Sequence, residues 1–394
     1  MTLTLAINPY TPGAGMLPKY LAGREQLTEN AIEVLSYVAH GYSTRSVVYY
    51  GLRGVGKTVL LSSIENIAYE NDVFYEHIEA LENESFTSTI SLYIMKLLGK
   101  MSFKEAAKIY IEKAKNVVAA FQFCYNHDGE TSIGINKDAF KGNGISDTGN
   151  LQNDLTELFV HLGKVGEKIG VGAVLFIDEI QYLKPTELEA LMAALHRCNQ
   201  LSLPLVVIAA GLPNIAKIAG DAKSYAERLF RFMVVDKLEM EAAKLALTRP
   251  AEAFKVSYTE EALQFILKET DCYPYFIQEF GQKVWNFKKN GIIDLEAAQM
   301  ALTEYKTSLD ESFYKVRHDR ASDKDLEFMK AMIECPSLPC AIKDVAKHMH
   351  CSTTQASPIR AKLIHKGLIY ASSRGEIDFT VPKFDEYLKR LYKE

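Results

Sequence analysis

The chain has few cysteines, and they are not arranged as a zinc site or a disulfide framework would require. Its 394 residues contain six, with no Cys-x-x-Cys pair among them: Cys124, Cys198, Cys272, Cys335, Cys340 and Cys351. We therefore expect reduced and mostly buried thiols. A metal cluster of the last three cysteines with His348 and His350 is the alternative, but these spacings match no common ligand pattern.

The sequence also lacks a run of 18 apolar residues, an N-terminal leader and an excess of positive charge. Residues 1–6 have neither the basic start nor the apolar length of a signal peptide, so we expect a cytoplasmic protein without a membrane partner. The net charge of −5 implies that any contact with nucleic acid needs a local basic face. The length allows two or three globular domains.

Residues 51–58 read Gly-Leu-Arg-Gly-Val-Gly-Lys-Thr, a complete phosphate-loop motif, and they follow an apolar run at 46–50. Glycines let backbone N–H groups wrap phosphate oxygens, a lysine brings charge to the β- and γ-phosphates, and a threonine hydroxyl suits Mg²⁺. A helix over 57–70 should follow. The predicted nucleotide-binding residues are Gly51, Arg53, Gly54, Val55, Gly56, Lys57, Thr58 and Val59.

A second motif lies at 173–179, where an apolar run leads directly to two carboxylates, Asp178 and Glu179. In this arrangement Asp178 holds Mg²⁺ together with Thr58, and Glu179 polarises the water that attacks the γ-phosphate. We therefore predict ATP hydrolysis, with Glu179 and Lys57 as catalytic groups.

The other elements indicate an α/β fold with a parallel sheet covered on both faces. Apolar runs at 72–78, 204–210 and 232–235 predict further strands, and Thr186 and Glu189 form a capping box before an amphipathic helix. We expect a helical insertion from about 82 to 171, with a mobile surface segment at 126–150.

After residue 238 the pattern becomes helical, with helices that start near Thr259, Pro274 and Asp294. A charged linker at 317–322 then leads to three short helices and a hairpin, which is typical of a winged helix. The expected domains are an ATPase core at 1–240, a helical lid at 241–318 and a winged helix at 319–394.

With these motifs, the chain resembles the AAA+ ATPases of the origin-recognition initiator group, and equally the archaeal and STAND-type ATPases. Residues 21–25, Leu-Ala-Gly-Arg-Glu, look like the element that precedes the core helix in these families. The resemblance implies ATP or ADP with Mg²⁺, and it places Tyr20 near the adenine. It also implies that Arg228 acts as an arginine finger in a homo-oligomer, unless Arg228 only pairs with an acid on the surface.

Two positions depart from the pattern of these families. The strand at 204–210 ends without a polar sensor residue, with Asn214 displaced from that place, and Cys272–Tyr275 stands where a sensor arginine is common. These two departures would imply that hydrolysis is slow and that the nucleotide serves as a switch.

The winged helix is predicted to contact double-stranded DNA, because positive residues exceed acids between 341 and 374. Against this, Pro358 would make the third helix begin only near Ser357. Two functions therefore remain open: an ATPase that assembles on DNA, or a STAND-like signalling or defence switch whose winged helix packs on the core or docks a protein partner. The candidate DNA contacts are Thr353, Thr354, Gln355, Arg360, Lys362 and Arg374.

Overall fold

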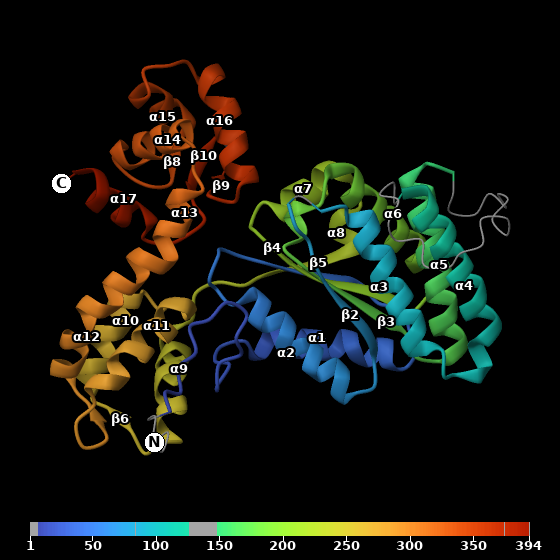
Figure 1. The fold of residues 1–394 in the computed structure, drawn as a ribbon, viewed down its shortest axis with the longest axis horizontal. Helices are drawn as coiled ribbons and strands as arrows, with labels where there is room; N and C mark the ends of the chain where they lie inside the picture. Colours follow the sequence, from blue (N-terminus) through green and yellow to red (C-terminus); the bar gives the residue numbers. More distant parts are fainter. Residues whose placement is uncertain (1–6, 83, 126–147, 374, 394) are drawn as a thin grey trace, which may run out of the picture. The chain divides into compact units, whose positions relative to one another are not determined.

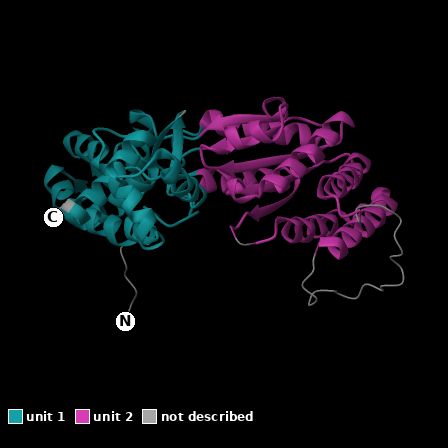
Figure 2. Ribbon diagram, turned by 90° about the horizontal axis from the view of Figure 1, so that it is seen from above, with its two compact units in different colours: residues 1–24, 51–56, 235–394 teal, residues 25–50, 57–234 magenta. Residues whose placement is uncertain are grey.

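The computed structural model describes residues 7–82, 84–125, 148–373 and 375–393. The chain divides into two compact units (Figure 2). The first, here called the sheet unit, comprises Glu25–Tyr50 and Lys57–Val234. The second, here called the helical unit, comprises Met1–Arg24, Gly51–Gly56 and Val235–Glu394. Most of the phosphate loop thus clusters with the helical unit, and the helix that follows the loop belongs to the sheet unit.

The sheet unit is built on five parallel strands in the order β2-β3-β4-β1-β5. Every apolar run that predicted a strand forms one, with only slight shifts at the ends: β1 Ser46–Tyr50, β2 Phe74–Glu79, β3 Ala173–Asp178, β4 Leu205–Gly211 and β5 Phe230–Val234. The carboxyl ends of parallel strands meet at one edge of a sheet, so the residues after β1 and β3 share that edge.

Helices cover both faces of this sheet (Figure 1). On one face lie α1 (Glu25–Ala39) and α2 (Lys57–Glu70), and the Tyr49 hydroxyl on β1 donates to the Leu27 carbonyl of α1 at 3.0 Å. On the other face, the side chains of Leu175 and Ile177 join the core with α5 (Leu151–Ile169) and α6 (Pro185–Gln200). A central strand covered on both sides must be apolar throughout, as β3 is.

The inserted segment is helical, as predicted. It contains α3 (Phe86–Met101), α4 (Lys108–Tyr125) and α5 (Leu151–Ile169), which Asn150 caps by accepting a hydrogen bond from Asn153 N–H at 3.1 Å. Apart from residues 148–150, the segment predicted to be a mobile surface loop lies outside the described residues. The sheet unit is completed by α6 (Pro185–Gln200), α7 (Ile215–Ala222) and α8 (Ala226–Leu229).

The capping box predicted at Thr186 and Glu189 is wrong. Helix α6 and its cap lie two residues earlier, and the Glu187 carboxylate accepts from the Lys184 backbone N–H at 2.8 Å. Proline favours the first position of a helix, because it lacks only an N–H that has no intrahelical partner there. Pro185 thus moves the start upstream and makes Glu187 the capping acid.

The helical unit begins with a bundle, here called the bundle segment: α9 Met240–Glu252, α10 Glu260–Thr270, α11 Pro274–Val284, α12 Leu295–Ser308, a π-helical turn Leu309–Tyr314 and α13 Lys315–Asp319. Thr259 and Asp294 cap α10 and α12, as predicted. The N-terminal chain packs on this bundle, where Tyr10 lies against Gly281 and its hydroxyl donates to the Leu247 carbonyl at 2.6 Å.

The linker predicted at 317–322 is wrong in its first part, because α13 continues to Asp319. Phe313 and Tyr314 are buried in an aromatic cluster directly before it, and they hold this turn in place. Charge on the exposed side of a helix does not end it.

The rest of the helical unit, here called the C-terminal segment, has the predicted order of three helices, a hairpin and a final helix: α14 Asp323–Glu334, β8 Cys340–Ala341, α15 Ile342–His348, α16 Thr353–His365, β9 Ile369–Ser373, β10 Glu376–Phe379 and α17 Phe384–Lys393. Strand β8 was not predicted, because two residues show no alternation. Its addition makes a three-stranded antiparallel sheet in the order β8-β10-β9.

Helix α16 begins at Thr353 although it contains Pro358. Ser352 accepts from Gln355 N–H at 3.3 Å, and the Gln355 side chain accepts from Ser352 N–H at 2.9 Å. This reciprocal cap stabilises the first turn, so a later start near Ser357 is wrong. Within the described residues, the helices are too short or too polar to cross a membrane.

Candidate nucleotide-binding site

The sheet unit brings together two of the predicted nucleotide residues. The Thr58 hydroxyl, on the first turn of α2, donates to Oδ2 of Asp178 at 2.6 Å. The other carboxylate oxygen of Asp178 accepts from Glu179 N–H at 2.8 Å. A hydroxyl and a carboxylate that converge are the hard oxygen ligands that Mg²⁺ prefers, so these residues fit the metal.

The Asp178 carboxylate is costly to keep ionised in this place. Its side chain is almost fully buried, and this burial raises its pKa above the ordinary aspartate value, against the Thr58 hydrogen bond. Glu179 raises the pKa further and Lys57 lowers it. A divalent cation would relieve this burial cost, because it favours the ionised form.

Glu179 has a backbone conformation that is uncommon for a residue with a side chain. Its φ and ψ are 51° and 38°, in the left-handed region directly after β3. Its carboxylate accepts a short hydrogen bond from Nε2 of the Gln181 side chain, and Oε1 of the same side chain accepts from Leu212 N–H at 2.9 Å. Strain of this kind concentrates at functional sites, where neighbouring contacts maintain it.

Gln181 is a residue that the sequence motifs did not identify. The strand β4 ends without the expected polar residue, and the structure places the Gln181 side chain against Gly211 at that strand end. Asn214, the displaced alternative, has a buried side-chain oxygen without a hydrogen bond among the described residues. The polar group at this position therefore comes from the turn after β3.

The phosphate loop has the backbone that its glycines predict. Gly54 and Gly56 have φ values of 87° and 92°, which side chains rarely adopt. At Gly51, a Cβ atom would lie 2.0 Å from the Val235 carbonyl oxygen, so no other residue fits there.

Three successive carbonyls of this loop accept hydrogen bonds from outside it. Arg53 O accepts from the Tyr273 hydroxyl, Gly54 O accepts from Tyr275 N–H at 3.2 Å, and Val55 O accepts from Arg24 Nη2 at 2.9 Å. Carbonyls held outward turn the intervening amides toward the inner side of the loop, as an anion cradle requires. The helical unit thus fixes the shape of the loop.

Arg24 lies in the residues that resemble a family element, but sequence reasoning gave it no role. Its side chain is 7% exposed, and its guanidinium also donates to the Asp236 carbonyl at 2.6 Å. A buried arginine that donates to backbone carbonyls is costly to replace, because those carbonyls lose their hydrogen-bond partners.

We expect Arg24→Met to lower the free energy of unfolding by about 2–3 kcal/mol and to weaken nucleotide binding by about tenfold. Urea titration and binding of a fluorescent ATP analogue measure both quantities. Arg249→Met is the matched control, because Arg249 is exposed and pairs with Glu252, its neighbour on the surface, at 3.1 Å. Equal losses in the two variants would show that Arg24 does not shape the loop.

Arg53 also connects the phosphate loop to the C-terminal segment. Its backbone N–H donates to the Thr380 carbonyl at 3.1 Å, and its Nε donates to the Gly367 carbonyl at 3.3 Å. Gly367 precedes β9 and Thr380 follows β10, and the Thr380 hydroxyl ties these two positions together by donating to Gly367 O at 2.6 Å. Through Arg53, the loop therefore contacts both ends of the hairpin directly.

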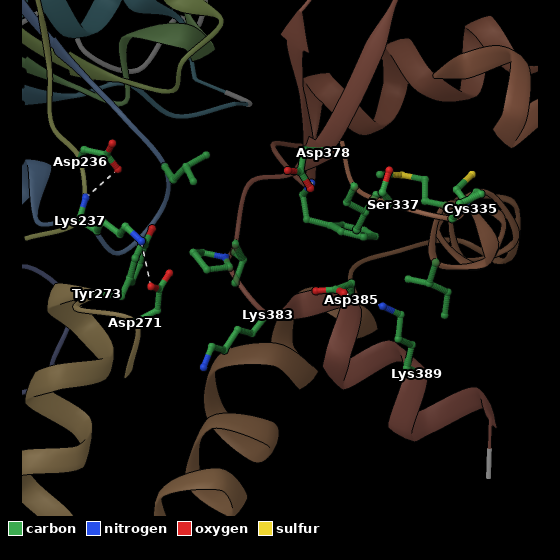
Figure 3. A pocket seen from close by; sticks show the side chains of 18 residues that line it. Asp236, Lys237, Asp271, Tyr273, Cys335, Ser337, Asp378, Lys383, Asp385 and Lys389 are labelled. Carbon is green, nitrogen blue, oxygen red and sulfur yellow. Dashed lines mark hydrogen bonds and ion pairs between the residues drawn. The ribbon is translucent and has the colours of Figure 1, made fainter. Parts of the chain in front are cut away.

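A pocket of about 470 Å³ lies beside this contact, between the bundle segment and the C-terminal segment (Figure 3). Charged groups line much of it, including Lys237, which pairs with Asp271 at 2.8 Å, and Lys389, which pairs with Asp385 at 2.8 Å. Because this pocket is polar and open, little apolar surface is buried at this point between the two segments. Both hydrogen bonds and aromatic contacts of Tyr314 join the two segments.

The remaining predicted nucleotide residues lie as follows. Lys57 is buried at the start of α2, and Val59 is half-buried on the same helix. Tyr20 is half-buried, without a hydrogen bond or ring contact to another described residue. Arg228 is exposed on α8 and forms no ion pair within the described part of the chain.

The predicted DNA contacts are only partly available. Thr353 and Thr354 are exposed, but the Gln355 side chain is engaged in the helix cap. Lys362 lies 3.8 Å from the Asp325 carboxylate, and the Nε of Arg360 is buried. Lys366, counted in the basic excess, pairs with the same carboxylate, and Arg374 lies outside the described residues.

Two family models match the sequence. Residues 20–208 match the AAA ATPase domain, and residues 311–388 match a domain of unknown function. The comparison with curated proteins gave no match.

Among solved structures, the chain is similar to a Walker-type ATPase of Pyrococcus abyssi, with 16% identity, 94% of this chain and 96% of that chain covered and a TM-score of 0.56. The Orc1 protein of Aeropyrum pernix, solved with DNA, has 13% identity, coverages of 95% and 94% and a TM-score of 0.47. The RuvB branch migration motor of Thermotoga maritima has 16% identity, coverages of 94% and 97% and a TM-score of 0.46.

At these identities the likeness is one of fold. It agrees with the parallel sheet, the phosphate loop and the carboxylates after β3, so the predicted resemblance is confirmed. Residues 20–208 thus match the AAA ATPase domain, and the chain has the fold of the AAA+ P-loop ATPases.

Proposed function

We propose that this chain binds ATP with Mg²⁺, hydrolyses it slowly, and uses the bound nucleotide to control the position of its C-terminal segment, which acts as a winged helix. The contact of Arg53 with Thr380 and Gly367 is the observation that carries the proposal. It joins a phosphate-binding residue to the hairpin of the C-terminal segment.

Binding and hydrolysis rest on the motif residues. The amides of Gly54–Lys57 and the Lys57 ammonium would hold the phosphates, while Thr58 and Asp178 would hold Mg²⁺, which supplies charge neutralisation of the phosphates when bound. Glu179, next to Asp178 and oriented by Gln181, would accept a proton from the attacking water. Arg228 would act only in an oligomer.

The switch follows from the position of Arg53 inside the cradle. A phosphate that binds the loop amides changes the field at Arg53, whose own N–H is bonded to the C-terminal segment. The pocket beside the contact is lined largely by charged groups, so the Arg53 bonds can break there without exposing a large apolar area. We propose that ADP keeps the contact closed and that ATP opens it, which frees a surface for a protein partner.

A DNA-associated ATPase is the second candidate. The exposed hydroxyls of Thr353 and Thr354 at the start of a capped helix favour it, since such a start suits a phosphate or a base edge. The internal pairing of Lys362 and Lys366 with Asp325 argues for the switch instead, because it removes charge from the basic face.

Hydrogen exchange of the backbone amides separates the two candidates. For the switch, we expect the Arg53 backbone amide to exchange at least about tenfold faster with a non-hydrolysable ATP analogue than with ADP, because its hydrogen bond to the Thr380 carbonyl is lost. Duplex DNA should leave the rate of phosphate release unchanged. The DNA-associated ATPase would be favoured if the exchange rate is the same with both nucleotides and duplex DNA stimulates hydrolysis. The oligomeric state of the protein in this assay is measured by light scattering.

A further inference from the structure

Gln181 connects the ends of two neighbouring strands of the sheet unit. Its Nε2 donates a short hydrogen bond to the Glu179 carboxylate, and its Oε1 accepts from Leu212 N–H at 2.9 Å. Glu179 directly follows β3, and Leu212 directly follows β4, which pairs with β3 in the sheet. One side-chain amide therefore ties the residue after one strand to the residue after the next.

The two hydrogen bonds explain why an amide stands at this position. An ionised carboxylate can only accept a hydrogen bond, and a backbone N–H can only donate one. The connection therefore needs a donor and an acceptor at the end of one side chain. Glutamine has both, whereas a carboxylate lacks the donor, an ammonium lacks the acceptor and an aliphatic side chain lacks the two.

The turn that carries Gln181 is held from its other side as well. This 3₁₀ turn spans Ile180–Tyr182, and Ile180 is 1% exposed within the core of the sheet unit. A Cβ atom at Gly211 would lie 2.9 Å from Cγ2 of Ile180 and 3.0 Å from Oε1 of Gln181. The turn and the end of β4 thus approach as closely as a glycine allows, which leaves the Gln181 amide little room to move.

A general base acts only when its oxygen lies within hydrogen-bond reach of the proton that it accepts. A misplacement of about 1 Å can cost about a hundredfold in rate. Glutamate has a long side chain with several rotatable bonds, so its carboxylate needs an external contact to stay in one place. The amide of Gln181 supplies such a contact to Glu179.

We propose that Gln181 is a positioning residue for Glu179 and that it takes its own position from the end of β4, so that the rate of ATP hydrolysis depends on the place of Leu212. This inference rests on the proposed function, in which Glu179 accepts a proton from the attacking water. The Leu212 carbonyl also accepts from Ile215 N–H at 3.0 Å, at the start of α7. A shift of the turn between β4 and α7 would therefore displace the base and slow turnover.

The first test compares Gln181→Met with the parent in steady-state phosphate release. Methionine is similar in length and flexible, but it cannot donate the hydrogen bond to the carboxylate. We expect kcat to fall by about tenfold or more and KM for ATP to stay within about twofold, because the lost contact orients the base and does not bind the nucleotide. Gln200→Met is the matched control, since Gln200 is exposed at the last residue of α6, and it should turn over like the parent.

A double variant separates positioning from support of the fold. If Gln181 acts through Glu179, its replacement has no further effect in a chain that already lacks the base. Glu179→Gln combined with Gln181→Met should therefore turn over within about twofold of Glu179→Gln alone. A residue that only supports the fold would slow both chains by the same factor, and that result would overturn the proposal.

Exchange of the Leu212 backbone amide, followed by NMR, tests the connection without any turnover. In Gln181→Met without ligand, this amide should exchange at least about tenfold faster than in the parent, because its acceptor is lost. An unchanged exchange rate would show that Gln181 does not bond the end of β4 in solution, and the proposal would be wrong.

Failure of this inference and failure of the proposed function give different results. If Glu179→Gln is slow and Gln181→Met turns over like the parent, only the positioning role is wrong. If Glu179→Gln itself turns over like the parent, Glu179 is not the base, and the proposed mechanism of hydrolysis is wrong together with the positioning role.

Discussion

Lys57→Ala is expected to abolish binding of MgATP, with a loss of affinity of about a hundredfold or more. Lys57 is the first residue of α2, and the residue as a whole is 6% exposed, so it has already lost most of its water. A desolvated cation at a helix N-terminus interacts strongly with phosphate, since little solvent remains to be displaced. Alanine removes the charge and keeps the helix.

The measurement is isothermal titration calorimetry with MgATP, and Lys217→Ala on α7 is the control, because Lys217 is an exposed lysine of the same unit. Both variants should unfold like the parent in urea, which separates a binding defect from a folding defect. Parent-like heat from Lys57→Ala would show that the lysine does not contact the phosphates. Absence of heat in the parent itself would remove the nucleotide site.

Much of the sheet unit could be predicted because its strands are covered on both faces. Such strands are continuous apolar runs, and β1, β3 and β4 are visible without any tertiary information. The 2.6 Å contact between Thr58 and Asp178 could also be anticipated, since residues that follow neighbouring parallel strands share one sheet edge.

The contacts that shape the phosphate loop could not be predicted in the same way. The partners of its carbonyls are Arg24, Tyr273 and Tyr275, which lie far from the loop in the sequence and follow no spacing rule. Their contacts depend on how the helical unit packs around the loop. A positive φ at Gly54 signals the turn but not the groups that hold it.

The basic excess of the C-terminal segment shows a different limit of sequence reasoning. A count of charges between 341 and 374 treats Lys362 and Lys366 as unpaired cations. In the structure, both lie within ion-pair distance of Asp325 on α14. Asp325 lies outside the counted window, and its own pKa is lowered by the Lys366 and Ser322 hydrogen bonds, against the effect of burial. Local charge counts overestimate a basic face when the neutralising acid comes from another helix.

Glu179→Gln is expected to keep MgATP affinity within a few-fold and to slow phosphate release by about a hundredfold or more, the range lost with a general base. Glutamine has the same shape and can still accept the hydrogen bond from Gln181, so the turn after β3 should remain in place. It cannot accept the proton of the attacking water. Steady-state phosphate release at saturating ATP measures the change.

Glu189→Gln on α6 is the matched control, because Glu189 is a partly exposed acid that pairs only loosely with Lys223, at 4.0 Å. Removal of the Glu179 charge should also lower the pKa of Asp178, since Glu179 raises it. Asp178 would then be ionised more readily, so reduced turnover could not be attributed to a lost metal ligand. Equal turnover in Glu179→Gln and the parent would therefore show that Glu179 is not the base.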